Sequence, residues 1–281
     1  MKTVGFVDYY IDEWHANKYC QLIDQYNGEH GAEYKVAYVW AELETSLRTG
    51  RTTDEWCAEH NATRCESIEE LCSLADHVLI LAPSDPNTHL GYAKRVFACG
   101  KNAYIDKTFA PNVKEALKIF EQAEKNGVKF FSSSALRYAD EIAEYKGNAK
   151  VVAATGCGSN LDEYVIHPLE MIVKCVGIGA ESVSYARHAD QETVSIEYAD
   201  GRYASILFAP FLVYGATVAG EDGVSKHLLA KSAFFYNLLS DVFRFFETGE
   251  LSFDGRETIE VMKLREAILS AKDTGKAQRV K

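Results

Sequence analysis

Short apolar runs alternate with amphipathic stretches through residues 4–131, and this alternation limits the fold more than any other feature of the sequence. Residues 4–7, 35–41 and 77–82 have the length and apolar character of strands, whereas residues 113–126 repeat apolar side chains at helical spacing. Strands that alternate with helices predict right-handed crossovers and a parallel sheet covered on both faces. The first half is therefore predicted to be an α/β domain with a doubly wound parallel sheet. Further strands are predicted at residues 102–106 and 128–131, and further helices at residues 13–26 and 89–99.

The second half of the chain has a different order of elements. One helix within residues 158–176 is followed by three strand candidates at residues 181–189, 192–199 and 202–209. The dipeptide Asp200-Gly201 between the last two is typical of a hairpin turn. Amphipathic helices then follow, so this half is predicted to be an α+β domain with antiparallel strands. We place the division at residue 137, which gives predicted domains of residues 1–137 and 138–281; the closing helices are predicted at residues 224–246 and 257–271.

The composition of the 281-residue chain limits the classes of function. Hydrophobic residues make up 47% and charged residues 25%, as in globular proteins. The net charge of −11 argues against nucleic acid or an anionic membrane surface as partner, because phosphate binding needs a basic surface. No segment approaches the roughly 20 apolar residues of a membrane helix. The seven cysteines are odd in number and show no Cys-x-x-Cys spacing, so we expect reduced thiols in a cytoplasmic protein.

The first predicted strand is not followed by the glycine-rich turn that dinucleotide-binding sheets carry at this point. Residues 8–13 read Asp-Tyr-Tyr-Ile-Asp-Glu, and no glycine follows Gly5 before Gly28. A phosphate would approach the N-terminus of the next helix here. Carboxylates at that position satisfy the helix dipole themselves and repel phosphate. The sequence thus predicts a nucleotide-binding topology without its usual phosphate loop.

Other predicted strand ends carry residues suited to a ligand, because ligands of parallel sheets bind at the carboxyl ends of the strands. Glu42 follows the second strand, where an acidic residue can bond a ribose hydroxyl; the alternative is a solvated loop carboxylate. Lys107 ends a later strand, where a lysine is not needed for packing. Trp14 and His15 belong to a polar-aromatic run after the first strand. They line either a pocket for a polyhydroxylated ligand or a contact between the domains.

A second polar cluster lies in the helix predicted for the second half. On one continuous helix four polar side chains share a stripe: Glu163, His167, Glu170 and Lys174. Three interpretations remain open: acid–base catalysis by His167 with Glu163 as its partner, a metal site, or a solvated face with i,i+4 pairs. The metal site lacks further ligands at fixed spacing. Pro168 can begin a helix, which would leave Glu163 in a preceding turn.

The order of four segments resembles the Gfo/Idh/MocA family of NAD(P)-dependent sugar and polyol oxidoreductases. These segments are HVLILAPSDPNTH at 77–89, GKNAYIDKTFA at 100–110, SSSALRY at 132–138 and EYVIHPLEMI at 163–172. The resemblance implies a Rossmann-like domain followed by an α+β domain with an open, largely antiparallel sheet. In the family this sheet commonly mediates oligomerisation, so a homo-oligomer, either a dimer or a tetramer, is implied.

The resemblance also implies roles for single residues. The family's Glu-Lys-Pro motif corresponds to Asp106-Lys107-Thr108, which places Lys107 beside the nicotinamide and the reacting hydroxyl. The family's Asp-x-x-x-His pair corresponds to Glu163 and His167, with a carboxylate one methylene longer. The implied catalytic residues are Lys107, His167 and Glu163. Together with the residues predicted from the strand ends, the candidate substrate residues are Trp14, His15, Lys107, Tyr164 and His167. The candidate cofactor residues are Asp8, Tyr9, Glu42, Pro83, Ser84, His89, Asp106, Lys107 and Arg137; no metal is predicted.

The implied reaction transfers a hydride between NAD or NADP and a secondary alcohol of a sugar or polyol. His167 removes the hydroxyl proton and Lys107 stabilises the developing alkoxide, while the cofactor supplies the hydride chemistry. Glu42 favours NAD, because a carboxylate repels a 2′-phosphate. One alternative is a non-catalytic ligand-binding or regulatory protein that has lost dinucleotide binding, as the missing phosphate loop suggests. Another is a lyase or hydrolase that keeps its cofactor bound.

Overall fold

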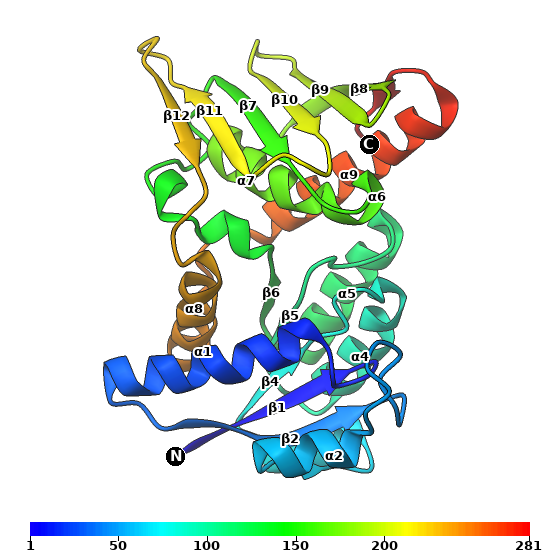
Figure 1. Ribbon diagram of the computed structural model, residues 1–281, viewed down its shortest axis with the longest axis vertical. Coiled ribbons are helices and arrows are strands. Elements are labelled where there is room, and N and C mark those ends of the chain that lie inside the picture. Colours follow the sequence, from blue (N-terminus) through cyan, green and yellow to red (C-terminus); the bar gives the residue numbers. More distant parts are fainter. The chain divides into compact units, whose positions relative to one another are not determined.

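The computed structural model describes residues 1–281, which form two compact units (Figure 1). The first unit comprises Met1–Ser132 and Leu239–Ser252, and the second comprises Ser133–Leu238 and Phe253–Lys281. The first division therefore follows Ser132, earlier than the predicted residue 137. The predicted second domain also differs, because a segment near its end belongs to the first unit.

The first unit is built on a six-stranded sheet with the order β3-β2-β1-β4-β5-β6. Every neighbouring pair of strands is parallel, which confirms the predicted doubly wound sheet. The strand order reverses between β1 and β4, and ligands of such sheets bind in the crevice at this reversal. The strands are β1 Lys2–Asp8, β2 Tyr34–Ala41, β3 Thr63–Arg64, β4 His77–Ile80, β5 Ala103–Ile105 and β6 Phe130–Ser132.

The helices of the first unit begin and end where local side-chain chemistry allows. Asn112 accepts a hydrogen bond from the backbone of α5, and Gly127 ends that helix in the left-handed conformation. Residues 67–70 read Ser-Ile-Glu-Glu, the pattern of a capping box, but at α3 this box is only half formed. Ser67 accepts from the Glu70 backbone at 3.0 Å, but the Glu70 carboxylate accepts from the Glu66 backbone instead of from Ser67. The helices are α1 Trp14–His30, α2 Thr53–His60, α3 Ile68–Leu74, α4 Pro86–Ala98 and α5 Val113–Asn126.

The strands at the reversal are buried on both faces. Val78, Leu79 and Ile80 of β4 have no exposed surface, as expected for a parallel strand between two helical layers. Gly5 of β1 allows α3 to approach closely, since a Cβ atom there would lie 2.5 Å from Leu71 Cδ2. This packing fixes the carboxyl ends of β1 and β4, where the predicted ligand residues lie.

The segment Leu239–Ser252 joins the first unit through aromatic packing by α8 (Phe234–Thr248). Phe243 stacks on Tyr34 of β2 with ring centroids 3.8 Å apart, and Phe246 stacks on His77 of β4 at 4.5 Å. Glu247 accepts a hydrogen bond from the Tyr34 hydroxyl. The periodicity of α8 predicts an apolar face but not the surface that it covers. The predicted domain range was therefore wrong for this segment.

The second unit contains a seven-stranded sheet with the order β12-β11-β7-β10-β9-β8-β13. Only β7 and β10 run parallel, and all other pairs are antiparallel, as predicted for this half. The prediction of a helix from residue 224 was wrong, because β12 pairs with β11 before α8 begins. The strands are β7 Val151–Gly156, β8 Ala180–His188, β9 Gln191–Tyr198, β10 Tyr203–Phe208, β11 Gly215–Ala219, β12 Ser225–Leu229 and β13 Gln278–Arg279.

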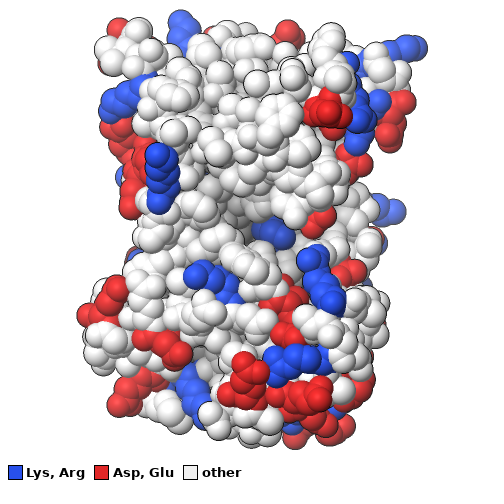
Figure 2. All heavy atoms as spheres, in the orientation of Figure 1, with Lys and Arg blue, Asp and Glu red and all other residues white.

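Helices pack on this second sheet, and α7 and α9 contact β7 and β8 respectively. Val151, Tyr203 and Leu207 of β7 and β10 are partly exposed. Figure 2 shows that the surface over these strands is largely free of charged side chains in this view. No helix in either unit has the length and apolar content needed to cross a membrane. The helices are α6 Leu161–Tyr164, α7 Ile166–Val176 and α9 Gly255–Thr274, with 3₁₀ turns η1 Ala135–Tyr138 and η2 Asp140–Ile142.

Candidate functional site

The predicted site residues fall into two groups, one within each unit. The first group lies at or after the carboxyl ends of β1, β2, β4 and β5: Asp8, Tyr9, Trp14, His15, Glu42, Pro83, Ser84, His89, Asp106 and Lys107. The second group lies in η1, α6 and α7: Arg137, Glu163, Tyr164 and His167. Each group has its own hydrogen-bond network.

Asp8 is the last residue of β1, and its carboxyl group links the ends of β1 and β4. Its Oδ1 atom accepts from the Tyr9 backbone at 2.7 Å and from the Ala82 backbone at 3.0 Å. Its Oδ2 atom is buried and has no hydrogen-bond partner. Burial, reinforced by the nearby Glu13 carboxylate, raises the pKa of Asp8 well above its ordinary value. These effects favour an uncharged carboxyl group at the sheet edge.

Glu13 caps the N-terminus of α1 with its own side chain. Its two carboxylate oxygens accept from the backbone N–H groups of His15 at 2.7 Å and Ala16 at 2.5 Å. Burial raises the pKa of this carboxyl group. The prediction that a carboxylate satisfies this helix end is confirmed. The amides that bind a diphosphate in dinucleotide-binding sheets are therefore occupied by the chain itself.

Lys107 and Asp106 form a charged cluster with His15 at the end of β5. His15 Nδ1 lies 2.5 Å from Asp106 Oδ2, and the Lys107 backbone donates to Asp106 Oδ1 at 2.8 Å. Burial opposes ionisation of Asp106, but the charges of His15 and Lys107 outweigh it and hold the pKa of Asp106 below its ordinary value. Lys107 Nζ donates to the Pro83 carbonyl at 3.2 Å. The half-exposed Trp14 ring contacts the His15 ring edge-on, with the ring centroids 5.2 Å apart.

The loop after β2 is tied to the loop after β1. The Leu43 backbone donates to the Tyr9 carbonyl at 2.8 Å, and Ser46 Oγ donates to the Asp12 carbonyl at 2.7 Å. Thr49 Oγ1 donates to the Asp12 carboxylate at 2.6 Å. These contacts hold the two loops together beside the point where the strand order reverses.

Arg48 is a residue of this loop that the sequence interpretation missed. Its Nε atom donates to the Tyr10 hydroxyl and its Nη2 atom donates to Ser84 Oγ, both at 3.2 Å. The guanidinium thereby links the loop after β2 to the turn after β4. In this topology an arginine after the second strand can accommodate the 2′-phosphate of NADP, so its position alone could have indicated Arg48 as a candidate anion contact.

Two predicted cofactor residues have clear intramolecular partners. The exposed Glu42 accepts a hydrogen bond from the Tyr92 hydroxyl at 2.6 Å. His89 is fully buried, with Nε2 2.6 Å from the Leu81 carbonyl and Nδ1 3.0 Å from the Phe109 carbonyl. His89 therefore ties together the segments after β4 and β5, and its direct contact with a cofactor, which the resemblance implied, does not agree with this burial.

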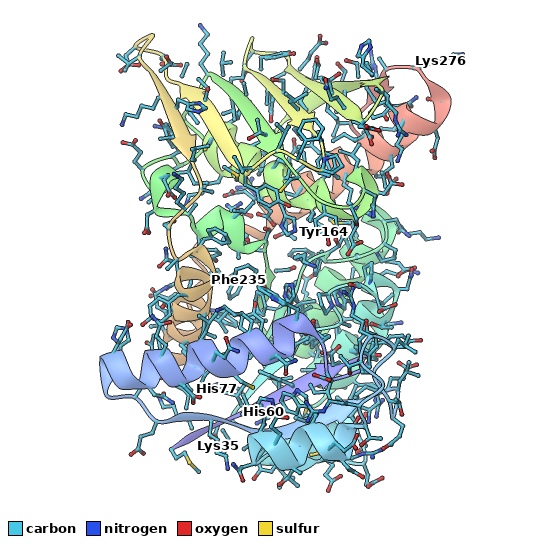
Figure 3. All side chains as sticks on the ribbon, viewed as in Figure 1. Lys35, His60, His77, Tyr164, Phe235 and Lys276 are labelled. Atoms are coloured by element: carbon cyan, nitrogen blue, oxygen red, sulfur yellow. The ribbon has the colours of Figure 1, made fainter.

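His167, the second residue of α7, is held by the hydroxyl of Ser134. Nδ1 of the ring lies 2.7 Å from Ser134 Oγ. The Tyr164 ring, labelled in Figure 3, lies 5.9 Å away. Pro168 is the third residue of α7, whereas Glu163 lies in the separate short helix α6. The continuous polar stripe of the sequence interpretation is therefore not formed.

Arg137 and Glu170 form a buried ion pair, with Nη1 and Oε2 3.2 Å apart. Arg137 also pairs with Glu257, and Lys174 Nζ donates to the Arg137 carbonyl at 2.8 Å. Glu170 is only 3% exposed, so the solvated-face interpretation is wrong for this residue. The predicted Glu170–Lys174 pair is replaced by contacts to Arg137. Arg137 is buried in this network, which does not agree with the cofactor contact that the resemblance implied.

Known structures contain the same two units. No family model and no curated protein matches the sequence. A probable dehydrogenase from Thermotoga maritima superposes with a TM-score of 0.77 at 14% identity, over 99% of each chain. A putative myo-inositol dehydrogenase from Sinorhizobium meliloti 1021 gives 0.76 at 13% identity, over 100% of each chain. GenD2 from gentamicin A biosynthesis, solved in complex with NAD, gives 0.75 at 15% identity, over 100% of this chain and 96% of GenD2.

The chain has the fold of these dehydrogenases. The agreement extends over both units, from the parallel sheet of the first to the mixed sheet of the second. The resemblance suggested by the four sequence segments is thereby confirmed for the fold. No three His, Cys, Asp or Glu side chains in the chain are grouped to hold a metal ion.

We expect an Asp8→Asn variant to gain stability relative to the wild type as the pH rises. An unfolded Asp ionises near pH 4, whereas burial raises the pKa of Asp8 in the folded state. The wild type therefore loses stability as the pH rises from the unfolded value through the folded one, and the variant lacks this loss. Denaturant unfolding at about pH 4.5 and about pH 8 gives the two free-energy differences. If the free energies of unfolding of variant and wild type differ by the same amount at both pH values, the raised pKa of Asp8 is contradicted.

Proposed function

We propose that the protein is an oxidoreductase that transfers a hydride between a nicotinamide cofactor and a secondary alcohol of a carbohydrate-like substrate. The fold agrees over nearly its whole length with dehydrogenases, one of them solved with NAD and one described as a putative myo-inositol dehydrogenase. In this chain's own structure the proposal is carried by Lys107. This lysine is only 9% exposed at the carboxyl edge of the sheet, where its ammonium meets a carbonyl and not a hydrophobic core.

The first unit fits a dinucleotide if the phosphates are held by a side chain. Glu13 occupies the α1 amides, but Arg48 supplies a cation at the same edge. A guanidinium binds phosphate oxygens bidentately, and that of Arg48 is held at this edge by the Tyr10 and Ser84 hydroxyls. The raised pKa of Asp8 reduces the repulsion that the sequence suggested. We therefore assign the cofactor's diphosphate to Arg48 and its ribose hydroxyls to Glu42, which favours NAD.

An Arg48→Ala variant should bind NAD(H) about 10- to 100-fold more weakly, because charge-assisted hydrogen bonds contribute about 1.5–3 kcal/mol each. Calorimetry measures the affinity for NAD(H) and NADP(H). Arg64→Ala is the matched control, since Arg64 is paired with Glu44 and Asp54 in the same unit. Equal losses for both cofactors agree with a diphosphate contact, whereas a loss for NADP(H) alone would assign Arg48 to the 2′-phosphate.

A wild type that binds neither cofactor would contradict the proposed oxidoreductase. The capped end of α1 would then favour the alternative of a ligand-binding protein that has lost dinucleotide binding. Unchanged affinity in the Arg48→Ala variant of a cofactor-binding wild type would remove only the role of Arg48.

We assign His167 the role of general base and Lys107 that of the cation that stabilises the developing alkoxide. The cofactor, when bound, supplies the hydride chemistry. The exposed Trp14 ring suits stacking on a sugar or polyol, and Tyr164 is assigned a substrate contact beside His167. The role of Glu163 as the partner of His167 stays a prediction.

Lys107→Ala and His167→Ala should each lower kcat by about 10²- to 10⁴-fold, the usual range for a positioned acid or base. If both groups act on one substrate atom, the double variant loses less than the product of the two single losses. Circular dichroism checks that the fold is retained. Full turnover in either single variant would overturn the assignment, and strictly multiplicative losses would separate the two roles.

The state of the cysteines bears on the compartment of the protein. All seven cysteines are free, which supports a reducing compartment and hence our prediction of the cytoplasm.

The second sheet has an exposed apolar area on β7 and β10. Val151 on β7 lies opposite Tyr203 on β10, and Leu207 lies further along β10. Their exposed fractions are 38%, 36% and 39%. We assign this uncharged area as the contact between copies of a homo-oligomer.

A Leu207→Asp variant should sediment as a smaller species than the wild type, because a charge at the contact would lose its hydration. Sedimentation velocity measures the mass of each species. Leu74→Asp is the control, because Leu74 is an exposed leucine of α3 in the first unit. A monomeric wild type, or a Leu207→Asp variant of unchanged mass, would show that this area is not the contact.

A further inference from the structure

We propose that Ser134 is the positioning residue of His167, and that its hydroxyl makes Nε2 the ring nitrogen that exchanges a proton with the substrate. This inference rests on the proposed function. Ser134 has no exposed surface and immediately precedes η1. Its Oγ atom lies 2.7 Å from His167 Nδ1, 33 residues further along the chain.

The position of the Ser134 hydroxyl is fixed by contacts other than the histidine. Its Oγ atom accepts from the Leu136 backbone at 3.3 Å, which caps η1. The Ser134 backbone donates to Glu170 Oε1, also at 3.3 Å. Glu170 is in turn paired with the buried Arg137. A hydroxyl anchored in this way holds Nδ1 at a defined place and leaves proton exchange with a ligand to Nε2.

A hydroxyl allows what a carboxylate partner would not. Serine both donates and accepts, whereas an ionised Asp or Glu only accepts. When Nδ1–H donates to Ser134 Oγ, Nε2 carries a lone pair and can act as a base. When the Ser134 O–H donates to Nδ1, Nε2 carries the proton and is a donor. The family-like carboxylate partner predicted from the sequence would allow only the first of these neutral states.

The proposed reaction uses the state with Nδ1–H on Ser134 Oγ in both directions, because Nε2 accepts the proton in one direction and the imidazolium returns it in the other. In oxidation the substrate O–H bond breaks and its proton moves to Nε2. The carbon that bears this oxygen gives up its hydrogen as a hydride to the cofactor. The resulting imidazolium keeps Nδ1–H on Ser134 Oγ. In reduction the Nε2 proton returns to the substrate oxygen as the carbon receives the hydride. Ser134 remains a neutral hydroxyl throughout, so it positions the histidine without taking the proton.

Nitrogen NMR of the histidine side chains tests the contact without any assay of activity. The ¹⁵N shifts of His167 report which ring nitrogen carries the proton. We expect Ser134→Ala to change the balance between the two neutral forms, and Ser134→Thr to restore it by keeping the hydroxyl. Ser133→Ala is the matched control, because the neighbouring Ser133 is equally buried and its Oγ donates to the Ser134 carbonyl at 3.0 Å. An unchanged His167 spectrum in Ser134→Ala would overturn the proposal.

Turnover provides the second measurement. A histidine that loses its anchor is displaced from the reactive geometry, so Ser134→Ala should lower kcat about 10- to 100-fold. The affinity for the cofactor should stay unchanged, and Ser134→Thr should recover the rate. If Ser134→Ala does not fold, Ser134→Gly replaces it, since glycine is well tolerated at the position before a helix. Equal rates in folded Ser134→Ala and wild type would overturn the positioning role.

The two proposals fail in different ways. A wild type without turnover on any sugar or polyol would contradict the oxidoreductase, yet the NMR comparison would still decide whether Ser134 sets the histidine's tautomer. If the wild type is active but the His167 spectrum is unchanged in Ser134→Ala, the proposed oxidoreductase stands and the positioning role of Ser134 is overturned.

Discussion

The carboxylate of Glu13 on the first amides of α1 is the contact on which the candidate site of the first unit depends. It satisfies the helix end with a group from the chain itself, so no ligand anion is needed there. The turn from β1 to α1 can then do without glycine and carry bulky side chains. The phosphate contact that we propose lies instead in the loop after β2, where Arg48 bonds to the Tyr10 and Ser84 hydroxyls.

Much of this arrangement follows from local sequence. Alternating strand and helix patterns predicted the parallel sheet, and the parallel sheet predicted that Lys107 and Glu42 lie at its carboxyl edge. The acidic run at residues 8–13 predicted a helix end that satisfies itself, which Glu13 confirms. These predictions succeeded because each depends on residues that are neighbours in sequence or on the fixed direction of parallel strands.

The remaining features depend on contacts between residues far apart in the chain. No spacing rule connects Ser134 with His167, or Arg137 with Glu257. A solvated stripe around His167 is a reasonable prediction from periodicity, which gives the faces of a helix but not their environment. His89 is predicted as a ligand residue, yet two carbonyl oxygens from different segments surround its ring. Burial of polar groups is decided by such long-range partners and is invisible to local patterns.

The return of residues 239–252 to the first unit has a consequence for synthesis. The chain leaves this unit after Ser132, completes most of the second unit, and only then supplies the helix that covers Tyr34 and His77. On the ribosome the first unit therefore cannot finish folding when its sheet emerges, although N-terminal domains generally fold first during synthesis. The helix that covers this aromatic surface lies more than a hundred residues further along the chain, so the first unit is complete only after most of the second has been synthesised.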